Sequence, residues 1–335
     1  MSASDWESPA TDRQAPAEGG ARHWSQIAEA SAVAGLWIMY ALYRIGGRLP
    51  FRALSYPVVS YYWLAYPGVR RASLEYLTRL QQATGALGRP PGWRDTLRHL
   101  LSFSDTLLDK MLAVGGHYRF DRLRFVGRPA LVDQLRSGRG ALLVTAHVGC
   151  LEMCQALADA PHLKLTVLVH TLHAERFNRL LERLSPGRAV RLLQVTELTP
   201  ATAVLLAERI EAGEFVAIAG DRVPLKAGRA SSVTVPFLGR PAPFPTGAYM
   251  LASLLKCPLY MMGCIRQGDA HEIVFQRIAD QVRLARGDRL AACAPYAADF
   301  ALRLERLLAR APYEWFNFYP FWDQPDGAEA PATHD

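Results

Sequence analysis

The sequence predicts an α/β fold in which a mixed, largely parallel sheet is covered by helices on both faces. Short, continuously apolar runs alternate with helical stretches along the second half of the chain, and such runs are typical of strands buried on both faces. At 335 residues the chain can bury one substantial core with a smaller helical attachment. Hydrophobic residues make up 50% and charged residues 21%, which excludes a disordered or fibrous chain.

The N-terminal third predicts a tail followed by membrane-associating helices. Residues 1–22 are rich in Ala, Ser, Pro and acids, which indicates a disordered tail and not a signal peptide. We expect residues 23–92 to form a helical segment at the membrane interface. The apolar run of residues 32–43 has 12 residues, whereas crossing a bilayer takes roughly 20. Residues 53–68 hold four Tyr and a Trp near several Arg, which is typical of an interfacial segment; two core helices of a soluble domain are the alternative.

A turn-rich linker, residues 85–92, leads into the α/β domain that we place at residues 93–322. Residues 93–113 have the periodicity of an amphipathic helix. Buried strands are expected at residues 141–146, 163–169, 215–220 and 258–265, and helices at residues 150–158, 174–184 and 246–256. An acidic, disordered tail is expected at residues 323–335.

Charge and cysteine usage restrict the partners and the compartment. The segments 1–20 and 321–335 hold eight of the 31 acids and one of the 38 bases, so the net charge is +7 for the chain and +14 for the body. Such a body favours an anionic membrane surface or an acidic partner. The five Cys form no C-x-x-C pair, which predicts reduced thiols in a cytosol-facing protein. His170 and His173 have no evident third ligand, and we expect no metal.

The first clear strand runs directly into His147, with Glu152 five residues later in the following helix. Sites of α/β proteins form at the carboxyl ends of strands. A carboxylate on one imidazole nitrogen fixes the tautomer, so that the other nitrogen can take a proton from an alcohol. His147 and Glu152 are therefore candidate catalytic residues; the alternative is a buried His beside a Glu that caps a helix.

Two further blocks carry candidate substrate-binding residues. Asp221 and Arg222 follow another buried strand, where a solvated ion pair is the alternative. Residues 233–247 hold four Pro and run into a helix, and they offer Arg240 and Gly247 to an anionic group at the helix start. An ordinary covering loop is the alternative for this segment.

Together these blocks resemble the lipid A biosynthesis acyltransferase family, the lauroyl- and myristoyl-transferring branch of the lysophospholipid acyltransferase superfamily. The H-x4-(D/E) motif matches His147 and Glu152, the Asp block matches Asp221, and S-S-x-x-V-P-F-x-G with T-G-x-x-x-L-A matches residues 231–252. The aromatic ending matches residues 311–316. The resemblance covers roughly residues 24–325. Residues 169–178 have no Arg at the position where the family usually has one, which indicates a divergent branch such as that of aryl polyene clusters.

The resemblance implies a glycerol-3-phosphate acyltransferase-like fold and an O-acyltransferase. An acyl chain would pass from an acyl carrier protein thioester to a hydroxyl of a lipid or glycolipid acceptor, at the cytoplasmic face of the inner membrane, where anionic lipids hold the protein peripherally or monotopically. His147 would be the general base, oriented by Glu152, while amides or cations near Asp221, Arg222 and Arg240 would hold the oxyanion or the carrier's phosphopantetheine. The resemblance implies no cofactor, metal or covalent enzyme intermediate.

Other functions remain as alternatives. No G-x-S-x-G nucleophile elbow and no phosphate-binding G-x-x-x-x-G-K-[ST] loop occurs in the chain. A membrane-associated glycosyltransferase-type enzyme would suit the basic body equally well, but it would usually need an acidic metal-binding cluster. A non-enzymatic basic protein that binds membranes or nucleic acid is the alternative from another class. The Arg residues of the chain are scattered and not grouped with stacking aromatics, so we expect no nucleic-acid partner.

Overall fold

A computed structural model describes residues 41, 43–114, 118, 122–157, 164–169, 190–194, 199–223, 231–285 and 287–323. The chain divides into two compact units, residues 1–54 and residues 55–335, and the sheet and the candidate site belong to the second. Outside the described residues lie the expected helix of residues 174–184, the pair His170 and His173, the N-terminal tail, the acidic tail beyond Asp323 and nearly all of the apolar run 32–43.

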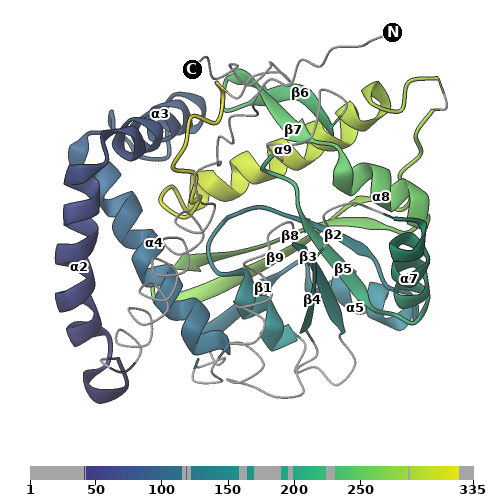
Figure 1. Ribbon diagram of the computed structural model, residues 1–335, viewed down its shortest axis with the longest axis horizontal. Helices are drawn as coiled ribbons and strands as arrows, with labels where there is room; N and C mark the ends of the chain where they lie inside the picture. Colours follow the sequence, from purple (N-terminus) through teal and green to yellow (C-terminus); the bar gives the residue numbers. More distant parts are fainter. Residues whose placement is uncertain are drawn as a thin grey trace, which may run out of the picture. The chain divides into compact units, whose positions relative to one another are not determined.

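The second unit is built on a sheet of seven strands in the order β1-β9-β8-β2-β5-β3-β4 (Figure 1). Strands β8, β2, β5, β3 and β4 run parallel, while β9 is antiparallel to β8 and parallel to β1. This confirms the predicted mixed, largely parallel sheet. The strands span β1 Leu123–Val126, β2 Leu142–Thr145, β3 Leu165–Val169, β4 Val190–Gln194, β5 Phe215–Ala219, β8 Leu259–Gln267 and β9 Ala270–Ala279.

The alternation of side chains along each strand divides the core into two layers. Leu142 and Val144 of β2 point into one layer and Leu143 into the other, because successive side chains of a strand leave opposite faces. The first layer contains buried side chains of four helices, namely α3 Pro67–Thr84, α7 Pro200–Glu211, α8 Gly247–Leu255 and α9 Ala294–Arg310. The second layer receives α5 Arg128–Arg136, the end of α4 Trp93–Val114, and the 3₁₀ helix η2 Leu151–Leu157. Both faces are thus covered, as the apolar strands predict.

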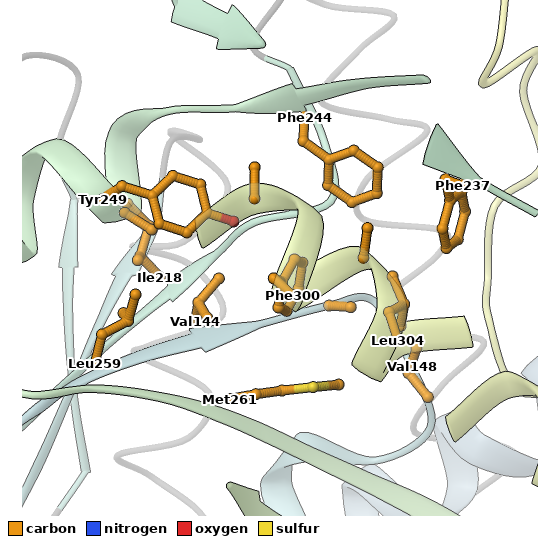
Figure 2. Close-up of a cluster of buried hydrophobic side chains, with 14 of the residues drawn as sticks. Val144, Val148, Ile218, Phe237, Phe244, Tyr249, Leu259, Met261, Phe300 and Leu304 are labelled. Carbon is orange, nitrogen blue, oxygen red and sulfur yellow. The ribbon is translucent and has the colours of Figure 1, made fainter. Parts of the chain in front are cut away.

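The Pro-rich segment is an ordered hairpin and not a loop. Strands β6 Ser232–Phe237 and β7 Arg240–Pro245 pair in antiparallel register as a separate two-stranded sheet. A sheet of two strands has an open edge on each, where Pro can be accommodated without breaking a ladder. Helix α9 packs against this hairpin on one side and against β8 and β9 on the other. The rings of Phe244 and Phe300 lie in this layer with their centroids 6.1 Å apart. Figure 2 shows both among the side chains of this layer, together with Val144 and Met261 of the sheet.

The expected helix of residues 150–158 forms as the 3₁₀ helix η2, which is tighter than an α-helix and turns its side chains in different directions. Another short 3₁₀ helix, η4 Ala291–Cys293, precedes α9. All five Cys are buried and free, as expected of small hydrophobic residues. Burial raises the pKa of the Cys150 and Cys154 thiols, so neither is a nucleophile at neutral pH.

Helix α2, Arg48–Ala65, ends against the start of α3 and α4. The indole N–H of Trp63 donates to Thr96 Oγ1 at 2.9 Å, and Arg70 Nη1 donates to the carbonyl oxygen of Leu64 at 2.6 Å. Carbonyls at a helix C-terminus lack helical partners, and the Arg70 guanidinium satisfies two of them, those of Trp63 and Leu64. Among the described residues, no helix combines the length and the apolar character that crossing a bilayer requires.

Candidate active site

The register of two neighbouring strands brings His147 and Asp221 together. Thr145, the last residue of β2, pairs with Ala219, the last residue of the parallel strand β5. His147 and Asp221 each lie two residues beyond these ends, so they leave the same carboxyl edge of the sheet side by side. Gly220 permits the approach, because a Cβ at this position would collide with the side chain of Val144.

Asp221 holds His147 by both of its carboxylate oxygens. The imidazole Nδ1 lies 2.8 Å from Oδ1, and the backbone N–H of His147 donates to Oδ2 at 2.8 Å. The side chain of His147 is 39% exposed, whereas that of Asp221 is 1% exposed. A carboxylate accepts a hydrogen bond from Nδ1–H, which leaves the Nε2 lone pair as the proton acceptor.

A third donor completes the surroundings of the carboxylate. The indole N–H of Trp315 donates to Asp221 Oδ2 at 2.9 Å. Burial acts to raise the pKa of Asp221, but the charge of His147 and the hydrogen bonds from His147 and Trp315 outweigh it, so the pKa lies below its ordinary value. Asp221 is therefore ionised at neutral pH.

Glu152 does not make the contact with His147 that the motif spacing predicts. Its carboxylate pairs with Lys110 of α4 at 3.2 Å, and the thiol of Cys150 lies 3.6 Å from Oε2. Both His147 and Glu152 belong to the described part of the chain, and no hydrogen bond or ion pair joins them there. The 3₁₀ turn of η2 directs Glu152 toward α4, while the β2–β5 register supplies the carboxylate for His147.

Lys110, the partner of Glu152, was not singled out by the sequence. Burial acts to lower its pKa, but the neighbouring Glu152 carboxylate outweighs this and raises it, so Lys110 is charged at neutral pH. Its side chain is still 30% exposed. No motif marks Lys110, since its helix reads as an ordinary amphipathic one.

The remaining candidates, Arg222, Arg240 and Gly247, have other partners or positions than the His147–Asp221 pair. Arg222 is exposed next to Asp221, and its Nη2 donates to the carbonyl oxygen of Phe316 at 3.0 Å. Arg240 begins β7 and pairs with Asp323 at 3.6 Å, and Gly247 begins α8. Within the described residues, no hydrogen bond or ion pair connects Arg240 or Gly247 with His147 or Asp221. A substrate-binding role for the last two remains a prediction.

The described residues hold no group of three or more His, Cys, Asp or Glu that could bind a metal ion. The chemistry of the site rests on a partly exposed imidazole with a buried anion beside it. The protein is thus an α/β protein with an imidazole and a carboxylate paired at the carboxyl edge of a mostly parallel sheet, an arrangement in which an imidazole can accept a proton.

The family follows from the comparison with known sequences. The family model described as bacterial lipid A biosynthesis acyltransferase matches residues 114–324, and the chain belongs to this family. A search of the curated proteins found no match. Membership indicates an enzyme that transfers acyl groups to a lipid acceptor, and it favours this activity over the glycosyltransferase and non-enzymatic alternatives. Assignment to the aryl polyene branch stays a prediction.

Proposed function

We propose that the protein transfers an acyl chain from an acyl carrier protein thioester to a hydroxyl of a lipid or glycolipid acceptor, with His147 as the general base. The observation that carries the proposal is the exposed imidazole of His147, 2.8 Å from the buried carboxylate of Asp221, in a chain of this family. Asp221 takes the orienting role for which the motif suggested Glu152.

The proposed reaction needs only groups that the chain and its substrates supply. Nε2 of His147 takes the hydroxyl proton as the acceptor oxygen attacks the thioester carbonyl carbon. The tetrahedral intermediate then expels the carrier's thiolate, which receives the proton from the imidazolium. The products are an ester of the acceptor and the free carrier thiol. The imidazolium formed on the way is stabilised by the Asp221 carboxylate.

Charge near the site supports an acidic carrier as the donor. Arg222 directly follows Asp221 in the chain and is exposed, and the body of the chain carries +14 between the acidic tails. Acyl carrier proteins are acidic, and their prosthetic arm carries a phosphate that cations attract. The purified protein should form labelled acyl-lipid from acyl carrier protein and a membrane lipid extract. If acyl coenzyme A serves and the carrier thioester does not, the proposed donor is wrong.

We also propose that the end of α2 docks on the anionic inner membrane at its cytoplasmic face. The surface at residues 58–66 exposes apolar and aromatic side chains, namely Val58, Tyr61, Tyr62, Leu64 and Tyr66. Trp93 of α4 is also exposed, and exposed Arg71 and Arg94 belong to the two helices that follow α2. Aromatic rings at headgroup depth with Arg on phosphates are the signature of an interfacial segment.

A matched pair of substitutions tests this surface. Leu64 is 65% exposed on α2, and Leu254 is 60% exposed on α8. Leu64→Asp should weaken binding to anionic phospholipid vesicles by about 10-fold, because it removes an apolar side chain that would insert into the lipid and adds a charge that the lipids repel. Leu254→Asp should leave vesicle binding unchanged. Equal loss in the two variants, or none in Leu64→Asp, would exclude this surface; flotation of vesicles with bound protein is the measurement.

A further inference from the structure

Trp315 contacts the Asp221 carboxylate that holds His147. Trp315 is 1% exposed, and its indole N–H donates to Asp221 Oδ2, the same oxygen that accepts the backbone N–H of His147. The other oxygen, Oδ1, faces the imidazole. Two donors therefore fix one oxygen of the carboxylate, and the carboxylate cannot rotate away from the imidazole without breaking both bonds.

The backbone on either side of Trp315 also holds the strand end that carries His147. Phe316 N donates to the carbonyl oxygen of His147 at 3.0 Å, and Gly149 N donates to that of Glu314 at 2.8 Å. Val148 and Trp315 form an antiparallel bridge between these two hydrogen bonds. The segment 314–316 is thus a short strand paired with residues 147–149, and only Gly fits at position 149, since a Cβ would collide with the carbonyl oxygen of Cys264.

Trp315 is itself held by its surroundings. Its ring packs edge-on against Tyr76, Phe237 and Phe321 at centroid distances of 5.0, 5.4 and 5.0 Å. The buried His99 lies with Nε2 2.7 Å from the carbonyl oxygen of Trp315. Burial lowers the pKa of His99 to about 4, against the opposing effect of that hydrogen bond, so His99 is neutral and donates from Nε2. A rigid indole can fix a carboxylate within the tolerance that catalysis needs.

We propose that Trp315 is a positioning residue of the His147–Asp221 pair, acting through its indole N–H on Asp221. It touches neither the substrate nor the reacting atoms, so its effect is on the orientation of the base. The proposal rests on the acyl transfer proposed above, because the orientation matters only if His147 takes the acceptor's proton.

The test is Trp315→Phe in the full chain, with Trp322→Phe as the matched control. Trp322 belongs to the same aromatic cluster, 6.3 Å from Trp315, but its indole N–H points to the carbonyl oxygen of Phe237. Both variants lose similar volume from one cluster, and only Trp315→Phe removes a donor from Asp221. Trp315→Phe should lower kcat by about 10-fold to 100-fold, the effect of one hydrogen bond to a charged group, with KM changed less than about 2-fold. Trp322→Phe should change neither. An unchanged kcat in Trp315→Phe, or equal losses in both variants, would overturn the proposal.

A second readout does not depend on activity. The indole N–H resonance of Trp315, assigned by its loss in Trp315→Phe, should shift in Asp221→Asn while that of Trp322 stays in place. If the Trp315 resonance does not respond, the indole does not hold Asp221 and the proposal is wrong. A chain that transfers no acyl group would instead overturn the proposed function, and the resonance would still decide whether the contact exists.

Discussion

His147→Ala should reduce acyl transfer from the carrier thioester by about 10²-fold to 10⁴-fold, the range over which a positioned general base accelerates proton transfer. Nε2 is the accessible proton acceptor beside Asp221, and alanine leaves the acceptor hydroxyl without one. The loss should fall on kcat, since the imidazole is proposed to take a proton and not to bind either substrate. The measurement is steady-state transfer to a lipid acceptor by the purified protein.

The fold should tolerate this substitution. The side chain of His147 is 39% exposed, so little packing is lost, and the backbone bonds to Asp221 and Phe316 do not need the imidazole. The thermal midpoint and vesicle binding should therefore remain close to those of the parent. Transfer by His147→Ala at the parental rate would remove His147 from the mechanism.

The strands that the sequence predicted are those whose side chains are buried on both faces. Residues 141–146, 215–220 and 258–265 form continuous apolar runs and contain β2, β5 and all but the last two residues of β8. Strand β9 was missed because His271, Glu272, Gln276 and Arg277 interrupt its apolar pattern. The hairpin β6–β7 was missed because Pro normally excludes a strand, and only its position outside the main sheet accommodates four of them.

The candidate site could be predicted only in part, because the sequence shows which residues follow a buried strand but not which strands are neighbours. His147 and Asp221 were each found by their place after a buried strand, but their contact depends on β2 and β5 being neighbours in register, which a single sequence does not contain. The motif spacing pointed instead to Glu152, because it is five residues from His147 in the sequence, whereas Asp221 is 74 residues away. Trp315 stood out only as an aromatic residue of the family-like ending, 94 residues from the carboxylate that it holds.

Asp221→Asn should lower kcat by roughly 10²-fold to 10⁴-fold. Comparison of this loss with that in Glu152→Gln shows which of the two carboxylates orients His147. Asn can meet the three donors around Asp221 in only two ways. If its amide oxygen accepts the backbone N–H of His147 and the indole N–H of Trp315, its NH₂ group faces Nδ1 of the imidazole. Neither the backbone nor the indole can change its donor, whereas the imidazole can change tautomer. The proton then moves to Nε2, where the base must be free.

The opposite orientation of the amide is worse for the fold. It keeps Nδ1 as a donor but sets the NH₂ group against two N–H groups in a buried site, which leaves both donors unsatisfied. The first arrangement should therefore prevail, with the protein folded and inactive. Nitrogen-15 spectra of the imidazole distinguish the tautomers directly, and the parent should carry its proton on Nδ1.

Glu152→Gln is the control, and it should cost less than about 10-fold. The substitution removes the charge that pairs with Lys110 but leaves the Asp221–His147 contact in place, and a partly exposed ion pair contributes about 1 kcal/mol or less. The ratio of the two losses assigns the orienting carboxylate. If Glu152→Gln abolishes transfer while Asp221→Asn keeps most of it, Glu152 orients the base during the reaction, and the pairing of His147 with Asp221 describes a resting arrangement that the substrates must rearrange.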